Sequence, residues 1–183
     1  MKLLMIFVDN FEDTEAIATL DTLRRGGNDV TTASLMKRRE IKPKYSAGYL
    51  VDTCIEDVNV QDFDGLIIPG GPGSMQLMPN MPIVFDLIRY FFEANKLVSA
   101  ICAAPALIGR LGILQNKNFT VHPGCEGPII GGNYKRECGV VRDGNIITAK
   151  SMYYSIQFAL EIQKYFYGEE NAKVLERACQ GER

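Results

Sequence analysis

The stretch that decides the fold is residues 97–105, Leu-Val-Ser-Ala-Ile-Cys-Ala-Ala-Pro. Its first five residues are mostly apolar and predict a buried strand, and residues 106–111 predict a helix. Cys102 therefore lies at an abrupt strand-to-helix corner, where small neighbours are needed because bulky ones would clash with the adjacent backbone. This geometry is that of a nucleophile elbow, with alanines at the positions where that motif usually has glycines.

The sulfur at this corner has two interpretations. The first N–H groups of a helix lack partners inside the helix, and the helix dipole favours negative charge. A thiol there is expected to have a pKa of about 3.5–7.5 rather than about 8.5. The alternative is a structural cysteine, because free cysteines are among the most buried residues in proteins. The stretch by itself leaves both interpretations open.

The composition is typical of a globular protein. The chain has 183 residues, of which 46% are hydrophobic and 23% charged, and we expect one domain, residues 1–183. The net charge of −2 argues against a nucleic-acid or membrane-surface partner. No apolar run approaches the roughly 20 residues of a membrane span, and residues 1–8 lead into a polar turn rather than a signal-peptide cleavage site. We therefore expect a cytoplasmic protein.

Five cysteines and one histidine limit the available chemistry. The cysteines form no Cys-x-x-Cys pair and are odd in number, which argues against a disulfide framework and a zinc ribbon. Reduced thiols in a reducing compartment are the simplest interpretation. His122 and Cys125 are three residues apart, but one histidine and one cysteine make a poor metal site, so no metal ligand is predicted.

Strands alternate with helices along the chain. Apolar runs predict strands at 2–8, 30–35, 64–68, 97–101 and 119–121, a hairpin at 139–148, and a short strand or hairpin within 45–54. Helices are predicted at 14–25, 81–94, 106–111 and 153–166, with an additional helix from about Gly168. The expected buried positions on the first helix and on 153–166 are Ile17, Leu20, Leu23, Ile156, Leu160 and Ile162. The basic segment 36–44 is expected to be a solvated loop without a function. This alternation predicts a three-layer α/β/α sandwich around a mainly parallel, flavodoxin-like sheet.

Four features follow the carboxyl ends of predicted strands, where the ligand sites of open α/β sheets lie. They are the loop before Glu15, the glycine-rich loop 69–73, Cys102 and His122. Glu15 lies about one turn into its helix and can reach toward the cysteine. If Glu15 is buried, desolvation raises its pKa and leaves a carboxylic acid that donates a hydrogen bond to a thiolate.

Each of these side chains also has an ordinary interpretation. Glu15 fits a first-turn carboxylate stabilised by the helix dipole, and Glu12 and Asp13 are equally eligible for an acidic role. The glycine-rich loop fits a simple tight turn. His122 fits a hydrogen-bonded structural histidine as well as a general acid or base.

Taken together, these motifs resemble the ThiJ/PfpI superfamily, in the branch of the parkinsonism-associated protein deglycase and its bacterial relatives. The resemblance covers roughly residues 2–166. Its matching pieces are Phe-Glu-Asp-Thr-Glu-Ala at 11–16, Ile-Pro-Gly-Gly at 68–71, Ala-Ile-Cys-Ala-Ala-Pro at 100–105 and Thr-Val-His-Pro at 120–123.

The resemblance also implies the residues of a site. It implies that Cys102 is the nucleophile, Glu15 its acidic partner and His122 a nearby histidine that takes part in catalysis. Neither a metal nor a cofactor is implied. The backbone N–H groups implied to line an oxyanion-type pocket are those of Gly70, Gly71 and Ala103.

Three departures from the family pattern narrow the function. Ala103 stands where the peptidase branch has a histidine directly after the cysteine, which argues against an intracellular peptidase. Ala47 stands where the deglycase branch usually has an arginine that binds anions and braces the dimer. Ala104 replaces the glycine after Cys-Ala, and the tail from Gly168 is longer than in compact members.

The activities of the family imply cofactor-free, glyoxalase III-like hydration of small α-oxoaldehydes such as methylglyoxal, or deglycation of glycated amines and thiols. In this hypothesis the Cys102 thiolate attacks the aldehyde, Glu15 and His122 move protons, and water releases lactate. The alternative is an oxidative-stress sensor or chaperone, in which Cys102 oxidises to sulfenic and then sulfinic acid. The resemblance also implies a homodimer.

Overall fold

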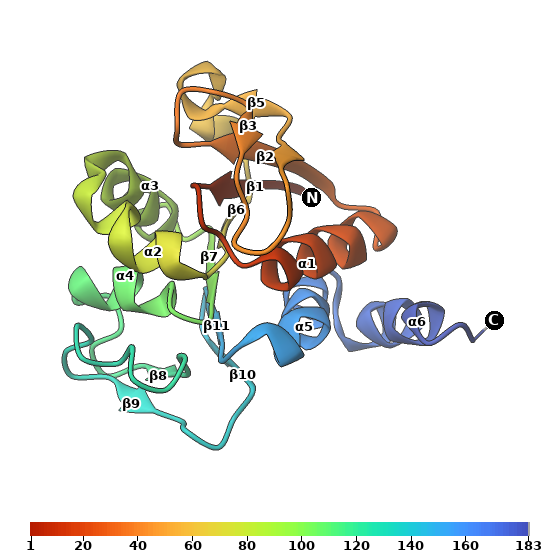
Figure 1. The fold of residues 1–183 in the computed structure, drawn as a ribbon. Helices are drawn as coiled ribbons and strands as arrows, with labels where there is room; N and C mark the ends of the chain where they lie inside the picture. The colour runs from red at the N-terminus through yellow and green to blue at the C-terminus, as the bar shows by residue number, and fades with distance from the viewer. Residues whose placement is uncertain (183) are drawn as a thin grey trace.

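A seven-stranded sheet forms the middle layer of the molecule, and helices cover both of its faces (Figure 1). The computed structural model describes residues 1–182. The strands of this sheet are β1 (Lys2–Phe7), β2 (Asp29–Ser34), β5 (Thr53–Cys54), β6 (Gly65–Ile68), β7 (Leu97–Ile101), β10 (Val140–Asp143) and β11 (Ile146–Ala149). The helices are α1 (Asp13–Arg25), α2 (Pro72–Gln76), α3 (Pro82–Glu93), α4 (Pro105–Arg110), α5 (Ser155–Tyr167) and α6 (Glu169–Cys179).

Two small separate sheets pair β3 (Glu40–Ile41) with β4 (Tyr49–Leu50) and β8 (Asn118–Phe119) with β9 (Asn133–Tyr134). Short 3₁₀ helices lie at Ile55–Asp57, Val60–Asp62, Met78–Asn80 and Met152–Tyr154.

The main sheet is parallel except at one edge. Its order is β10-β11-β7-β6-β1-β2-β5, and β10 runs antiparallel to β11. The longer parallel strands have the order β2-β1-β6-β7-β11, which is the flavodoxin-like arrangement 2-1-3-4-5. The predicted three-layer sandwich with a mainly parallel sheet is therefore confirmed. In such folds the ligand site lies where the strand order reverses, here between β1 and β6.

Strand β1 shows how the sequence builds two cores. Leu4 and Ile6 face the side covered by α3 and α4, and Leu3, Met5 and Phe7 face the side covered by α1 and α5. All five side chains are fully buried. A parallel strand with helices on both faces is apolar on both faces, which explains the unbroken apolar run at the start of the chain.

The expected burial of Ile17 and Ile156 is wrong, since these side chains are 37% and 47% exposed. On both helices the buried stripe follows the i, i+3, i+4, i+7 spacing, and each isoleucine lies one residue after the start of that stripe, about 100° around the helix. Leu160, also expected to be buried, is partly exposed. The buried stripes are Ala16, Thr19, Leu20 and Leu23 on α1, and Ser155, Phe158, Ala159 and Ile162 on α5.

Two predicted strands differ in position. Residues 119–121 were expected to form a strand of the main alternation, but only Phe119 is in a strand, in the small β8–β9 sheet. Within the segment 45–54, the short strand or hairpin is confirmed in two parts. Strand β4 closes a hairpin with β3, and β5 extends the main sheet beside β2.

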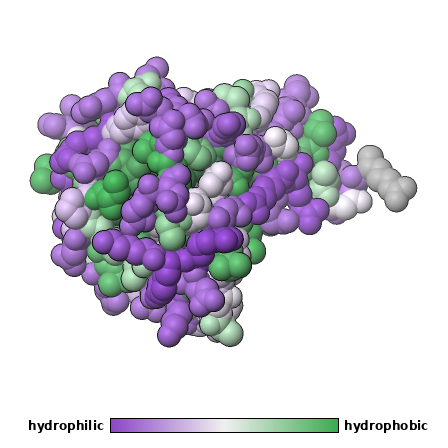
Figure 2. All heavy atoms as spheres, turned by 90° about the horizontal axis from the view of Figure 1, so that it is seen from above, coloured by the Kyte–Doolittle hydropathy of each residue, from purple (hydrophilic) through white to green (hydrophobic). Residues whose placement is uncertain are grey.

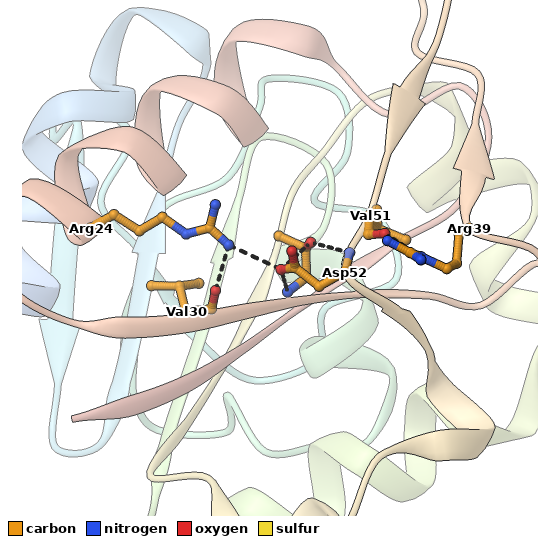
Figure 3. A network of polar contacts seen from close by, with 6 residues as sticks. Arg24, Val30, Arg39, Val51 and Asp52 are labelled. Carbon is orange, nitrogen blue, oxygen red and sulfur yellow. Dashed lines mark hydrogen bonds and ion pairs between the residues drawn. The ribbon is translucent and has the colours of Figure 1, made fainter.

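A polar network fastens β2 to the segment before β5 (Figure 3). The carboxylate of Asp52 accepts hydrogen bonds from the backbone N–H and the hydroxyl of Thr32, at 2.9 and 2.7 Å. The Arg24 guanidinium lies 3.0 Å from the same carboxylate and also donates to the Val30 carbonyl. Arg39 donates to the Val51 carbonyl at 2.9 Å. Asp52 is thus supplied with donors on several sides, and its pKa is lowered.

The additional helix expected from Gly168 is α6, which packs against α5. Leu175 is buried there, and Gln163 of α5 donates to the Asn171 side chain at 2.6 Å and to the Gly26 carbonyl at 3.0 Å. Hydrophilic residues cover most of the face shown in Figure 2, with apolar ones in small groups between them. Within residues 1–182, no helix combines the length and the apolarity that crossing a membrane requires.

Candidate active site

Cys102 occupies a strained corner between β7 and α4. Its φ angle is +65°, in the left-handed region that non-glycine residues rarely adopt at a cost of roughly 1–3 kcal/mol. The Cys102 N–H continues the sheet by donating to the Ala149 carbonyl at 2.8 Å, and the Ala104 N–H turns back to the Ile101 carbonyl at 3.1 Å. The expected elbow is present, with the thiol half-buried at the end of the strand.

Gly70 allows three segments to meet at this corner. A Cβ at this position would lie 2.5 Å from the Cys102 Cβ, 2.5 Å from the Glu15 Oε2 and 2.8 Å from the Ile101 carbonyl oxygen. No real Cβ atom approaches its neighbours so closely. The glycine-rich loop is therefore more than a tight turn, because its lack of a side chain brings the thiol and the carboxyl together.

Glu15 is the acidic residue that the fold directs into the sheet end. It lies in the first turn of α1 and is 1% exposed, whereas Glu12 and Asp13 are only partly buried. Glu12 instead caps the helix, since its Oε2 accepts a hydrogen bond from the Glu15 N–H at 2.7 Å. The choice between these three carboxyls, which the sequence left open, is thus resolved by burial.

The environment of Glu15 favours its neutral form. Burial is the largest cause and raises the pKa of this carboxyl to about 7, while the Cys102 thiol and the Gly70 N–H act in the opposite direction. Within the described residues, the Glu15 Oε2 has no partner at hydrogen-bonding geometry. A buried carboxyl of this kind exchanges protons near neutral pH.

The expected lowering of the Cys102 pKa is wrong. Burial, followed by the negative charge and hydrogen bonding of Glu15, raises the pKa of this thiol. The helix supplies little compensation, because α4 has six residues and begins three residues after Cys102. When Glu15 is protonated its negative charge is gone and its O–H can donate to the sulfur, which leaves burial as the cause that still raises the thiol pKa.

Two backbone N–H groups act against the rise in the pKa of the Cys102 thiol. The N–H groups of Gly71 and Ala103 face Cys102 and lower its pKa. Gly70 differs from the expectation, because its N–H faces the Glu15 carboxyl instead. The structure therefore places two of the three expected donors at the sulfur and the third at the acid.

His122 lies at the mouth of the site. Its backbone N–H donates to the Cys102 carbonyl at 2.7 Å, which ties the loop after β8 to the elbow. The residue is exposed and lines the same cavity as Cys102. It is accordingly placed to meet a ligand that enters from solvent.

These groups share a cavity of about 390 Å³. Sequence reasoning identified its floor and missed most of its walls, including Lys44 in the segment to which it assigned no function. One signal was available, since Lys44 lies three residues before Ala47, where the family arginine is missing. The lining residues are Glu12, Glu15, Lys44, Tyr45, Gly71, Pro72, Met75, Cys102, Ala103, His122, Cys125, Ser151 and Met152.

The wall that carries Lys44 and Tyr45 is fixed to the loop before α1. The Lys44 N–H donates to the Phe11 carbonyl at 2.9 Å, and the Tyr45 N–H donates to the Asp13 carboxylate at 3.1 Å. The Lys44 Nζ lies 4.7 Å from the centre of the Tyr45 ring. Ala47 lines a different groove. Lys44 is therefore the cation at this cavity, whose charge acts on both Glu15 and Cys102.

A metal centre has no support in the part of the chain that the structure describes. No group of three or more His, Cys, Asp and Glu side chains there has an arrangement that holds a metal ion. The five cysteines are free thiols.

The site pairs the buried Glu15 carboxyl with the Cys102 thiol on a strained elbow. It lies at the carboxyl ends of the strands of a flavodoxin-like sheet. These features are those of cysteine-centred α/β sandwich proteins. The chain belongs to the DJ-1/PfpI family, whose model matches residues 1–165. This confirms the family resemblance described above.

Three relatives illustrate the family. The chain is 32% identical to the protein dj-1beta of Drosophila melanogaster, over 93% of this chain and 91% of the relative. The crystal structure of that protein superposes with a TM-score of 0.90, covering 98% of this chain and 97% of the other. A deglycase of Pyrococcus abyssi is 31% identical over 82% of this chain and 90% of its own. A glutathione-independent glyoxalase of Caenorhabditis elegans is 31% identical over 94% and 92%. Two of these relatives are named as enzymes, a deglycase and a glyoxalase, which confirms the general expectation that this chain is an enzyme.

Proposed function

We propose that this protein is a cysteine-dependent, cofactor-free enzyme that hydrates small α-oxoaldehydes such as methylglyoxal to α-hydroxy acids. The observation that carries the proposal is the buried Glu15 carboxyl beside the Cys102 thiol, with a pKa of about 7. A carboxyl with this pKa can accept the thiol proton and return it within one catalytic cycle. Relatives named as a deglycase and a glyoxalase support the choice of substrate.

The first step forms a bond between the Cys102 Sγ and the aldehyde carbon. The thiol proton passes to Glu15, and negative charge develops on the former aldehyde oxygen. The N–H groups of Gly71 and Ala103 stabilise that charge, and protonation of the oxygen gives a hemithioacetal.

The next steps move hydrogen within the substrate. Removal of the proton from the carbon bonded to sulfur gives an enediol, and protonation of the neighbouring carbon gives a thioester of lactate. The aldehyde carbon is oxidised to the acid level while the ketone carbon is reduced to an alcohol, so no external oxidant or reductant is needed. Water then cleaves the thioester and restores the thiol. Glu15 is the proton carrier, and His122 serves at the solvent side.

Deglycation starts from an adduct of an α-oxoaldehyde with an amine or a thiol. The Cys102 Sγ forms its bond to the carbon that carries the hydroxyl, the bond from that carbon to the amine or thiol breaks, and the released group takes the thiol proton through Glu15. The hemithioacetal that remains then follows the same steps to the acid. A peptidase remains disfavoured, because Ala103 is the residue directly after the cysteine.

We further propose that the active form is a homodimer in a reducing, cytoplasmic compartment. Ile17 and Ile156 lie exposed on α1 and α5, two helices that pack against each other, and they offer an apolar contact surface. The five free cysteines suit a reducing compartment. Light scattering is expected to give about twice the chain mass of 20.4 kDa.

The test is turnover of methylglyoxal to lactate by the purified protein. We expect Cys102→Ala to abolish turnover and Glu15→Gln to reduce it by about 100-fold or more, since general acid–base groups contribute about 10²–10⁴-fold. Cys179→Ser is the matched control, because Cys179 is exposed on α6 and lies outside the cavity. Equal turnover by the wild type and Cys102→Ala would refute the proposal.

A second candidate is an oxidative-stress sensor or chaperone. It is favoured by a half-buried thiol beside a carboxyl that, when protonated, can donate to a sulfinate oxygen. Mild peroxide treatment followed by mass spectrometry distinguishes the candidates. A sensor requires Cys102 to oxidise faster than Cys54 and Cys179, together with an absence of methylglyoxal turnover in the reduced protein.

A further inference from the structure

A second cysteine, Cys125, lines the same cavity as Cys102. The proposed hydration reaction does not use it. Cys125 is a half-buried free thiol, and neither Cys54, Cys138 nor Cys179 is among the residues that line this cavity. Two thiols that share one cavity of about 390 Å³ raise the question of whether they react with each other.

The backbone places Cys125 two hydrogen bonds away from Cys102. The His122 N–H donates to the Cys102 carbonyl at 2.7 Å, and the Cys125 N–H donates to the His122 carbonyl at 2.9 Å. The second bond closes a β-turn with Pro123 and Gly124 at its centre, and Gly124 has a φ of +91°. This is the Pro-Gly signature of a type II turn, in which the first and fourth Cα atoms lie within about 7 Å of each other.

We propose that Cys125 is a resolving cysteine that captures oxidised Cys102 as a reversible intramolecular disulfide. A peroxide first transfers one oxygen atom to the Cys102 thiolate, which gives a sulfenic acid and releases the reduced peroxide as water or an alcohol. The Cys125 sulfur then attacks the Cys102 sulfur. The S–S bond forms, the S–O bond breaks, and the hydroxyl leaves with the Cys125 proton as water.

The surroundings of the two thiols assign them these different roles. Burial raises the pKa of both thiols, and the negative charge of Glu15 at Cys102 and of Glu126 at Cys125 acts in the same direction, so the difference between them lies in their neighbours. Cys102 has Glu15 beside it as a proton acceptor and the Gly71 and Ala103 N–H groups facing its sulfur. Oxidation is therefore expected to begin at Cys102.

Any movement that closes the disulfide is expected in the turn that carries Cys125. A disulfide needs a Cα–Cα separation of about 4.4–6.8 Å. Cys102 is held in the sheet, whereas Pro123 and Gly124 are exposed on the turn that carries Cys125. The Glu126 carboxylate holds this turn, since it accepts from the Gly124 N–H at 2.6 Å and pairs with Arg136 at 3.6 Å.

The consequence is protection of the nucleophile of the proposed enzyme. A sulfenic acid left alone proceeds to sulfinic acid, which cellular thiols do not reverse, whereas a disulfide is reopened by thiol–disulfide exchange. The inference rests on the reactive Cys102 of the proposed function. Its test measures peptide and protein masses rather than turnover, so that a failure of this inference can be told apart from a failure of the proposed function.

The experiment treats the reduced full-length protein with hydrogen peroxide, blocks free thiols with N-ethylmaleimide under denaturing conditions, and maps a non-reducing tryptic digest. Trypsin places Cys102 in residues 97–110, Cys125 in 118–135 and Cys138 in 137–142. We expect a cross-linked pair of the first two peptides, with the whole chain lighter by two hydrogen atoms and two fewer maleimides. A thiol reductant is expected to reverse the change.

Two variants make the result specific. In Cys125→Ser we expect no cross-link and a gain of two oxygen atoms on Cys102 that thiols do not reverse. In Cys138→Ser, which removes another half-buried thiol, the cross-link is expected to form as in the wild type. The proposal is overturned if wild-type Cys102 gains oxygen while Cys125 carries maleimide, or if Cys102 stays unoxidised in excess peroxide. Methylglyoxal turnover of the untreated protein is measured in parallel and reports on the proposed function alone.

Discussion

Two carboxyls of this molecule lie near strand ends and have opposite surroundings. Asp52, at the β2 edge, accepts hydrogen bonds from Thr32 and faces the Arg24 guanidinium at 3.0 Å (Figure 3). Its pKa is lowered, although burial acts in the opposite direction. Glu15 is 1% exposed, has an oxygen without a partner among the described residues, and has a pKa raised to about 7. The same functional group is stabilised as an anion in one place and destabilised in the other.

This difference separates a carboxyl that stabilises the fold as an anion from one that the proposed function uses as a proton carrier. Asp52 lowers the free energy of the folded state by remaining charged, and it joins two segments of the edge. Glu15 costs free energy whenever it is charged, and a fold retains such a group where the proton itself is used. The opposite pKa shifts of Asp52 and Glu15 depend on hydrogen-bond donors and on burial. Substitutions that change either of these should alter the shifts in a known direction.

Outside Cys102 and Glu15 themselves, the largest effect is expected from Gly70→Ala. The new Cβ would lie 2.5 Å from both the Cys102 Cβ and the Glu15 Oε2, so at least one of the two reactive groups must move. We expect a loss of methylglyoxal turnover of about 100-fold or more, because displacing reacting groups by about 1 Å costs about that factor. Overpacking is also expected to lower the free energy of unfolding by about 1–3 kcal/mol.

Gly48→Ala is the matched control for this substitution. A Cβ at Gly48 meets no heavy atom within 4 Å, and both glycines have a φ that alanine tolerates. Stability and turnover are expected to stay near those of the wild type. If Gly70→Ala were equally silent, the close approach at Gly70 would not be what assembles the site.

The next effect concerns stability and pH. Since the pKa of Glu15 is about 7 in the folded protein and about 4.5 in its ordinary state, the folded state binds this proton more tightly than the unfolded state. Its contribution is therefore complete below pH 4.5 and is lost as the pH rises through about 7, by on the order of 3 kcal/mol. We expect Glu15→Gln to remove this loss, so that it becomes more stable than the wild type at pH 8 but not at pH 4.

Asp52→Asn should have the opposite pH dependence. The lowered pKa of Asp52 means that its contribution is present above its ordinary pKa of 3.8 and is lost as the pH falls below it. The variant is therefore expected to be less stable than the wild type at pH 7, with a difference that shrinks as the pH falls below 3.8. Denaturant unfolding of both variants at several pH values checks the pair. Parallel pH profiles for the two variants would contradict the contrast drawn here.

The sequence predicts the fold more fully than it predicts the site. Apolar runs and glycine-rich turns lead to the correct sheet layers because burial on two faces leaves a direct trace in β1 and β7. The elbow at Cys102 is also readable, since it needs small residues on both sides. The exposure of Ile17 and Ile156 could not be read, because it depends on which stripe of each helix meets the sheet.

The sequence predicted which residues form the candidate site, but it did not predict their pKa shifts correctly. A position near the start of a helix predicts a lowered thiol pKa, yet burial and then the negative charge of Glu15 raise the pKa of Cys102. Glu15 could not be distinguished from Glu12 and Asp13 until their burial was known. Lys44 escaped notice because it reaches the cavity through contacts between loops far apart in the chain, which no local pattern encodes.

The smallest effect is expected from Lys44→Met. Lys44 is an exposed cation at the cavity wall whose charge favours negative charge on both Glu15 and Cys102. Its removal should slow alkylation of Cys102 near pH 7 by about twofold, as is typical of an exposed charge pair. Because salt screens such charges, the difference should shrink at about 1 M salt. Lys44→Arg should retain the wild-type rate, and Lys42→Met, which removes a cation from the neighbouring groove, should leave it unchanged. An equal slowing of alkylation by Lys42→Met would assign the effect to the net charge of the protein. A slowing specific to Lys44→Met would show that one exposed cation partly offsets the burial that keeps the Cys102 thiol protonated.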